Sequence, residues 1–221
     1  MLITRFGHSC VLVEVADARI LIDPGIFTDQ AAFRLTDLSA IVVTHQHPDH
    51  IDRTRIDVLA AMNPDALLIA ETQTHVGLPG WQENAAGVTY SVDGATITGV
   101  GRMHAPILPM IPQVGNVGVT ITAPGSPVFF HPGDTYEHRP EGVHVLALPL
   151  TAPWAKISET VEFVQAVGAP IVFPIHDAAI TEEAYDIYYG QIATHGNVED
   201  LRKISAKGHL EIVPNEENAA R

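Results

Sequence analysis

The segment from 45 to 50, His-Gln-His-Pro-Asp-His, constrains this chain more than any other, because it places four potential metal ligands within six residues. It directly follows an apolar run that is typical of a buried strand. At a strand end, His45 and His47 can point their imidazoles toward one side, while Asp49 and His50 follow on the turn. Imidazole nitrogens and carboxylate oxygens are ligands that zinc and similar divalent ions accept. The motif therefore predicts a metal site with room for a second ion. A polar turn with solvated histidines is the alternative.

Length and charge limit the classes of protein to consider. With 221 residues and 46% hydrophobic residues, the chain can form one substantial core, so we expect a single domain over 1–221 with a frayed polar tail at 214–221. The net charge of −14 would repel a polyanion over most of the surface, which argues against nucleic acid as a partner. Cys10 is the only cysteine, which excludes an intrachain disulfide and a cysteine-based zinc site.

The chain carries no address signal. No segment approaches the length needed to span a membrane, and the N-terminal residues lack a long apolar signal region. We therefore expect a cytoplasmic protein without a membrane partner. A homo-oligomer stays open, because apolar loops on an acidic surface allow a dimer or a larger ring.

The order of predicted elements indicates the fold class. Apolar runs separated by turn signals predict strands at 10–15, 19–22, 40–44, 67–70, 88–90, 95–100, 117–123, 127–131, 143–148, 170–174 and 210–213. Helical spacing predicts helices at 56–62, 157–167 and 182–192, with Ser158 capping the second and Gly168 ending it. Two β-rich halves that each finish in helices favour an α/β protein with two packed sheets and helices outside.

Three further candidate ligands each follow a predicted strand: His104, Asp134 and His176. Strand ends are where a rigid scaffold presents ligands on short loops. A lone histidine after a strand is more often structural or solvated. Together with the first motif, however, the three residues complete a plausible set of seven ligands.

With these residues in place, the chain resembles the metallo-β-lactamase superfamily over roughly residues 1–213. The start Gly7-His8-Ser9 and the segment 131–135, His-Pro-Gly-Asp-Thr, resemble a compact branch that includes ascorbate-6-phosphate lactonase-like proteins. The resemblance implies an α/β fold of the metallo-β-lactamase-like four-layer αβ/βα sandwich type, with the metals in the cleft at the sheet edges. It further implies two divalent ions, zinc being the first expectation, with manganese, iron or nickel as alternatives.

The resemblance also divides the ligands between the two ions. One ion would be held by His45, His47 and His104, the other by Asp49, His50 and His176, and Asp134 would bridge both. Two ions roughly 3.5–4 Å apart can share a hydroxide and clamp the reacting oxygen of a substrate.

We therefore predict a binuclear metal-dependent hydrolase, whose bridging hydroxide attacks a small ester, lactone or phosphoester. Asp49 is expected to orient the nucleophile as well as bind metal, and His8 is the candidate general acid or substrate hydrogen-bond donor. A capping or surface role for His8 stays open. Asp23 matches a family position and is expected to orient a ligand histidine, although a simple Asp-Pro-Gly turn also explains it.

Several residues near the motif are expected to support the ligands or to contact substrate. Thr44 and Thr135 are expected to brace ligands, and Asp177 to cap a helix. The stiff apolar loop at 105–112 is expected to form a lip over the metals, with burial against another subunit as the alternative. Candidates for substrate contact, each with a core or solvated alternative, are Trp154, Tyr136, His138 and Arg139.

Other functions of the superfamily are less consistent with this chain. A phosphodiesterase or nuclease is disfavoured by the acidic charge and the few basic residues. A di-iron redox protein usually has an acidic residue in the third-ligand region and an attached flavin domain, and we identify neither. A non-catalytic binding protein is disfavoured because all seven ligand positions are filled.

Overall fold

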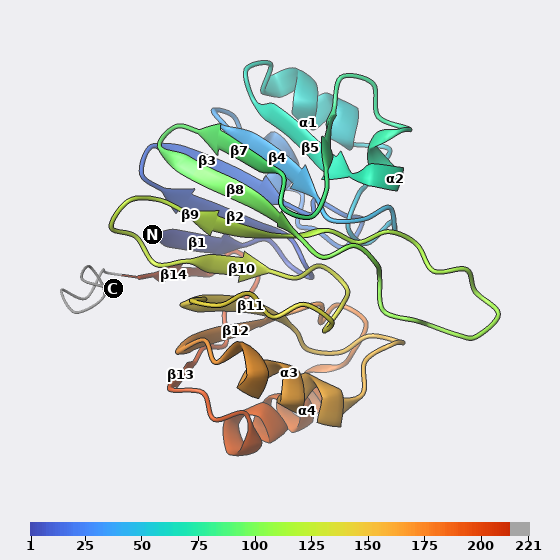
Figure 1. The fold of residues 1–221 in the computed structure, drawn as a ribbon, viewed down its shortest axis with the longest axis vertical. Coiled ribbons are helices and arrows are strands. Elements are labelled where there is room, and N and C mark those ends of the chain that lie inside the picture. The colour runs from blue at the N-terminus through green and yellow to red at the C-terminus, as the bar shows by residue number, and fades with distance from the viewer. Residues whose placement is uncertain (213–221) are drawn as a thin grey trace.

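A computed structural model of the protein describes residues 1–212. Two seven-stranded mixed sheets pack face to face, and helices cover their outer faces (Figure 1). The first sheet has the order β14 (His209–Glu211), β1 (Leu2–Arg5), β2 (Val11–Val15), β3 (Ala18–Ile22), β4 (Ala40–Val43), β5 (Leu67–Glu71) and β6 (Gln82–Asn84). The second has the order β13 (Asp200–Leu201), β12 (Ile171–Ile175), β11 (Val145–Pro149), β10 (Phe129–His131), β9 (Gly118–Thr122), β8 (Ala95–Val100) and β7 (Thr89–Val92).

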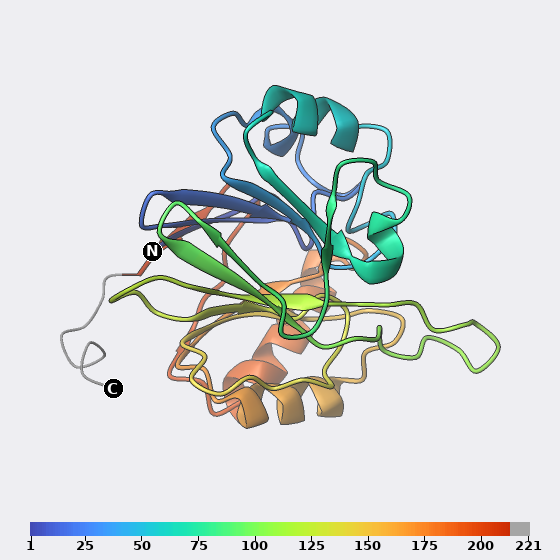
Figure 2. The same cartoon turned by 45° about the horizontal axis from the view of Figure 1, so that its top comes forward.

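The helices lie outside this pair of sheets, as Figure 2 shows from a second direction. Helices α1 (Ile56–Met62) and α2 (Thr72–His75), with the short 3₁₀ helix Ala32–Arg34, lie on the side of the first sheet. Helices α3 (Ile157–Val167) and α4 (Glu182–His195) cover the second sheet. The predicted four-layer αβ/βα sandwich is therefore confirmed.

Three apolar clusters hold the layers together, because the central strands are buried on both faces. In β2, Val11 and Val13 point into the cluster between the sheets, whereas Leu12 points into the cluster under α1. In β11, likewise, Val145 points into the cluster between the sheets and Leu146 points into the cluster under α3 and α4. This two-sided burial explains why these strands read as continuous apolar runs instead of alternating ones.

The structure departs from the sequence prediction at several short elements. Strands β1, β6 and β13 and helix α2 were not predicted, and β14 joins the first sheet by pairing Ile3 with Leu210. Ser158 does not cap α3, whose N-cap position is Lys156 and has no side-chain cap hydrogen bond, whereas Gly168 ends the helix as predicted, in the left-handed conformation. The predicted frayed tail at 214–221 lies outside the described residues. Within residues 1–212, no helix is both long and apolar enough to cross a bilayer.

Candidate metal centre

The predicted ligands reach one place because the strands that precede them end at the same side of the sandwich. His45 directly follows the loop residue after β4, His176 directly follows β12, and Asp134 closes the loop after β10. Such strand ends are held by hydrogen bonds to their neighbours, so their loops start from rigid positions. The structure brings all seven predicted ligands together, in the three overlapping clusters His8-Asp49-His50-His176, His45-His47-His104 and His45-His50-Asp134.

In each of these clusters the potential ligand atoms lie within 4.8 Å of one another. The first cluster contains the three residues expected at one ion, and the second contains the three expected at the other. The third cluster connects the two groups through Asp134. This is the division that the resemblance implied, with His8 as an additional neighbour.

Asp134 is the centre of the arrangement. Its Oδ1 lies 3.1 Å from His50 Nε2, and its Oδ2 lies 3.4 Å from His104 Nε2 and 3.1 Å from His176 Nε2. Trp154 Nε1 donates a hydrogen bond of 2.9 Å to the same Oδ2. One carboxylate therefore faces ligands from both groups, as a bridging role requires.

In His45 and His50, the ring nitrogen Nδ1 contacts a neighbouring side chain. Asp23, which is fully buried, accepts from His50 Nδ1 at 2.6 Å and from the Thr44 amide and hydroxyl at 2.7 Å each. The Thr44 hydroxyl also lies 3.1 Å from His45 Nδ1. The expected bracing roles of Asp23 and Thr44 are therefore present in the geometry. Such contacts fix the orientation and the tautomer of a ligand histidine.

Backbone carbonyls brace two other rings in the same way. His104 Nδ1 lies 2.5 Å from the Ala105 carbonyl, and His176 Nδ1 lies 2.7 Å from the Thr151 carbonyl. Because a carbonyl only accepts, each Nδ1 carries a proton, which leaves Nε2 as the nitrogen that faces the centre. A bound cation would take the place of any proton on Nε2.

The centre also leaves buried polar atoms without partners. The close contacts of the histidines with Asp134 do not meet hydrogen-bond geometry, so within residues 1–212 four buried atoms have no hydrogen-bond partner: His50 Nε2, His104 Nε2, His176 Nε2 and Asp134 Oδ1. Burying such atoms unpaired costs free energy, which a cation can offset by accepting their lone pairs. Nitrogen and carboxylate donors suit zinc and several other divalent ions. The residues present therefore fit the metals that the fold implies.

The charge states of these groups follow from burial and proximity. Burial lowers the pKa of His45 and His47, so both rings are neutral at pH 7. Burial opposes protonation of His176 as well, but Asp134 and Asp49 raise its pKa to about 9. The pKa of His50 likewise lies well above its ordinary value, because Asp134 and Asp23 outweigh burial. In the absence of metal, protons therefore stabilise the buried carboxylates.

His8 is buried and lies against the second group of ligands. Its Nδ1 accepts a 3.2 Å hydrogen bond from the Ala178 amide, so its Nε2 carries the proton and donates to Asp49 Oδ2 at 3.2 Å. Burial lowers the pKa of His8, which keeps the ring neutral. These contacts favour positioning of Asp49 over the surface alternative, while its role as a general acid stays a prediction.

Three residues of the site have left-handed backbone conformations. The φ angles are 47° at His8, 51° at Asp23 and 58° at His176. Such conformations cost about 1–3 kcal/mol each and persist only where the surroundings determine them. At these three residues, tertiary contacts hold the backbone in a conformation that its local preference disfavours.

The prediction that Asp177 caps a helix is wrong. Thr181 caps α4, and the Asp177 carboxylate forms an ion pair with Arg5 instead. Arg5 is buried, and its guanidinium also donates to the carbonyls of His8 and Ile204. Sequence reasoning missed Arg5, because only the fold brings residues so far apart in the chain into contact.

Other side chains around the centre differ from their predicted roles. Tyr136 is buried and its hydroxyl donates to the Pro149 carbonyl at 2.6 Å, so the hydroxyl is already occupied within the protein. Thr135 accepts from the Glu137 amide and not from a ligand. Trp154, expected to touch substrate or core, packs against the core cluster under α3 and α4, and it also connects Asp134 to the Tyr136 ring, whose centroid is 4.8 Å away.

The loop at 105–112 projects from the molecule beside the centre, at the yellow-green part of the chain (Figure 1). Ile107 and Ile111 line a cavity of about 50 Å³ together with the ligands His47 and His104. Met110 at the tip is 76% exposed. Ile107 and Ile111 therefore lie next to two predicted ligands, while a lip over the metals stays a prediction.

Comparison with known proteins agrees with this architecture. Residues 2–176 match the beta-lactamase superfamily domain. Protein Rv0786c of Mycobacterium tuberculosis is 42% identical over 195 residues, which are 87% of this chain and 91% of that one. A UPF0173 metal-dependent hydrolase of Xanthobacter autotrophicus is 32% identical over 153 residues, 61% of this chain and 62% of that one. The metallo-beta-lactamase fold protein YhfI of Bacillus subtilis superimposes with a TM-score of 0.74 at 16% identity, covering 95% of this chain and 98% of that one. The chain therefore belongs to the beta-lactamase superfamily, in a compact branch with the metallo-β-lactamase fold.

Proposed function

We propose that this protein is a metal-dependent hydrolase that acts on a small molecule. The observation that carries the proposal is the position of Asp134, whose two oxygens face histidines of both ligand groups at 3.1–3.4 Å. A buried carboxylate shared in this way suits a pair of cations better than a single one. The name of the Xanthobacter relative, a metal-dependent hydrolase, supports the same class.

We further propose that the centre takes two divalent ions, zinc being the first candidate. One ion would lie among the first three ligands and the other among the second three, with Asp134 between them; the two sets are His45-His47-His104 and Asp49-His50-His176. When bound, such ions lower the pKa of water toward neutrality and polarise the bond under attack.

The chain's own residues would orient this chemistry and restrict water. His8 holds Asp49 in place through its Nε2 proton, and Asp49 itself keeps about a quarter of its side-chain surface exposed. His47 is also half-buried, so the open side of the centre lies near Asp49 and His47. The apolar base of the loop at 105–112 limits access of water from the side of His104.

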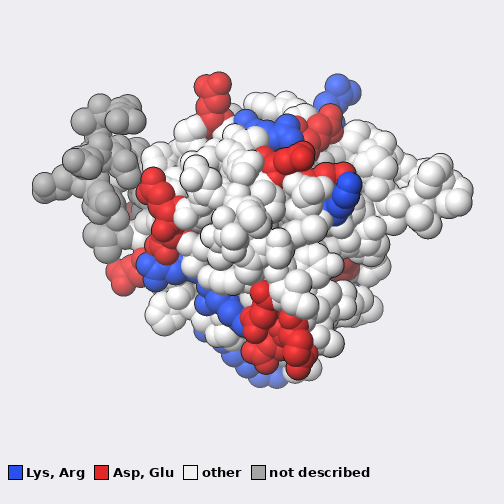
Figure 3. All heavy atoms as spheres, turned by 90° about the horizontal axis from the view of Figure 1, so that it is seen from below, with Lys and Arg blue, Asp and Glu red and all other residues white. Residues whose placement is uncertain are grey.

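The proposed substrate class is a small ester, lactone or phosphoester. The charge of −14 works against binding of long polyanions. On the face seen from below, the basic side chains lie in a narrow band bordered by acidic groups and do not form a broad basic patch (Figure 3). A nuclease would need such a patch to follow a phosphate backbone.

The test combines metal analysis with a panel of esters, lactones, phosphodiesters and thioesters, run with and without chelator. Asp134→Ala should lose bound metal and hydrolysis together, because it removes the shared carboxylate. Asp200, a half-buried residue of β13 that pairs with Arg202 and belongs to none of the ligand clusters, provides the control Asp200→Ala. Full metal-dependent turnover in Asp134→Ala would contradict the proposal, as would an iron-loaded protein with a redox absorption band and no hydrolysis.

A further inference from the structure

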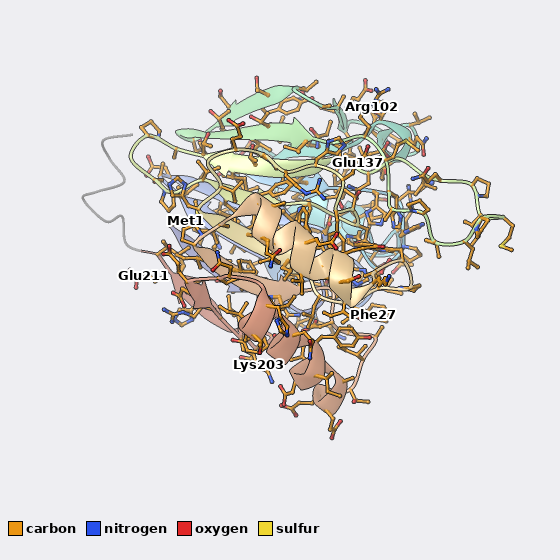
Figure 4. The ribbon with its side chains drawn as sticks, turned by 60° about the horizontal axis from the view of Figure 1, so that its bottom comes forward. Met1, Phe27, Arg102, Glu137, Lys203 and Glu211 are labelled. Atoms are coloured by element: carbon orange, nitrogen blue, oxygen red, sulfur yellow. The ribbon has the colours of Figure 1, made fainter. Side chains whose placement is uncertain are left out.

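A cavity of about 650 Å³ lies beside the metal centre, on the side of α4. This volume is in the range of pockets that hold drug-sized ligands. Figure 4 labels two lining residues, Phe27 and Lys203, on the lower side of the view, where α4 also lies. The walls come from the end of β1 and the loop after it, Phe27 in the loop after β3, the loop before α4, α4 itself and the segment 203–206.

Two hydrogen-bond donors in the cavity wall are buried and have no partner within residues 1–212. They are Tyr185 Oη, on a residue that is 6% exposed, and Arg5 Nε, on a residue that is 4% exposed. The other guanidinium nitrogens of Arg5 are occupied by Asp177 and by backbone carbonyls. Burial raises the pKa of Tyr185, so its hydroxyl is protonated and able to donate. Buried donors are normally paired, so these two call for an acceptor, and both residues line the cavity.

The charged groups of the cavity neutralise one another in pairs. Arg5 pairs with Asp177, and Lys203 Nζ lies 3.8 Å from a Glu182 oxygen and 2.9 Å from an Asp186 oxygen. A charged ligand would lie close to both positive and negative side chains, so attraction to one would be offset by repulsion from the other. The cavity therefore favours an uncharged ligand.

The rest of the wall is apolar and reaches the metal centre. Phe27 and Ile180 supply the larger apolar surfaces, and Phe27 is 49% exposed. The Phe27 ring meets the His8 ring edge-on, with centroids 5.3 Å apart, and His8 in turn contacts Asp49. A molecule that lies across Phe27 can therefore occupy the cavity and place its other end at the metal ligands.

We propose that this cavity binds the uncharged, largely apolar part of the substrate, through a carbonyl or hydroxyl oxygen that accepts hydrogen bonds from Tyr185 and Arg5. This narrows the substrate to a neutral ester or lactone with an apolar chain that carries an oxygen. The assignment of the ligand as substrate rests on the proposed hydrolase function. Binding of a neutral acceptor to the cavity does not.

The test is a binding measurement with a molecule that cannot be hydrolysed. The probe is 4-phenyl-2-butanone, whose carbonyl accepts a hydrogen bond, and n-butylbenzene is the acceptor-free analogue of similar shape. We expect Tyr185→Phe to weaken ketone binding about two- to tenfold, the range for loss of one hydrogen bond, and to leave butylbenzene binding unchanged. Because the hydroxyl has no partner in the described residues, the substitution should not reduce stability.

Tyr189→Phe is the matched control on the same helix. Tyr189 stacks on Tyr185 at 5.9 Å, but its hydroxyl donates to the Leu201 carbonyl and it does not line the cavity. This variant should lose some stability and keep both affinities. A second variant, Ala206→Trp, fills the cavity from its exposed rim and should abolish binding of both probes.

The proposal is overturned if wild-type protein does not bind the ketone, if Tyr185→Phe binds it as tightly as wild type, or if Ala206→Trp retains it. A separate hydrolysis arm compares p-nitrophenyl hexanoate with p-nitrophenyl 5-oxohexanoate. The ratio of their KM values should change in Tyr185→Phe and stay constant in Tyr189→Phe. If neither ester is hydrolysed while the ketone still binds, the proposed function fails and the cavity assignment stands.

Discussion

Replacing Asp23 with asparagine should deprive His50 of its bracing carboxylate while leaving every predicted ligand in place. Asp23 Oδ1 accepts from the Thr44 amide, and Oδ2 accepts from the Thr44 hydroxyl and from His50 Nδ1. An asparagine has one accepting oxygen and one donating amide. If its oxygen faces the Thr44 amide, its NH₂ faces His50 Nδ1 and drives the proton to Nε2, which is the atom that faces Asp134. In the reversed orientation, the NH₂ of the asparagine would face the Thr44 amide, so that two N–H donors would meet.

The expected loss in metal affinity is about ten- to hundredfold. A hydrogen bond to a charged group contributes about 1.5–3 kcal/mol, and 1.4 kcal/mol corresponds to a factor of ten. Loss of a partner behind a metal-binding histidine costs a similar factor. Asp23 is fully buried, so water does not replace the missing acceptor.

Competition with a chromophoric chelator measures the zinc affinity of Asp23→Asn. Asp52→Asn is the control, since Asp52 is also buried and accepts from Thr54 and Arg55 without touching a predicted ligand. It should lower the melting temperature and leave the zinc affinity unchanged. An Asp23→Asn affinity within twofold of wild type would refute the reasoning, and so would an equal loss in Asp52→Asn.

Three further perturbations follow from the same geometry. Gly25→Ala should lower both metal content and melting temperature, because its methyl group would overlap the Asp49 backbone, whereas Gly190→Ala in α4 meets no atom and should stabilise by about 1 kcal/mol in denaturant unfolding. Trp154→Phe should keep its metal and lower kcat severalfold in steady-state kinetics, because it removes a donor to the shared carboxylate and no ligand. Metal-free protein should lose stability as pH rises from about 6.5 toward 9 in urea unfolding: His176 has a folded-state pKa of about 9, above its ordinary value, so its stabilising proton is fully bound below that window and lost within it. Bound zinc should remove this dependence.

Each of these has a contrary outcome. Wild-type metal content in Gly25→Ala would show that the motif loop adapts without loss. Loss of metal from Trp154→Phe would make the indole donor a structural support of the centre. Stability of the metal-free protein that is flat or rising between pH 6.5 and 9 would contradict the protonated state of His176.

The identity of the ligands could be predicted from local sequence. The motif at 45–50 has metal-binding side chains at close spacing after an apolar strand, and His104, Asp134 and His176 each follow a strand or its loop. Strand ends depend on nearby residues, so their positions are readable from apolar runs and turn signals. The two packed sheets with helices outside follow from the same order of elements.

Contacts between distant segments could not be predicted in this way. Strand β1 was missed because its stability comes from pairing with β2 and β14, and β14 lies at the other end of the described chain. The role of Asp177 was predicted wrongly because its partner is Arg5, and the contact of Trp154 with Asp134 joins two separate loops. Local propensity contains no information about such partners.

The sequence by itself determined which side chains bind metal in our proposal and that strands present them, because both depend on residue type and short-range pattern. Only the tertiary structure decided how those side chains are oriented: the tautomer of His8, the bracing of His50 and the cavity between Phe27 and α4. Hydrogen-bond direction and cavity shape depend on atoms that approach within a few ångströms across the fold. A linear pattern of residues does not specify those approaches.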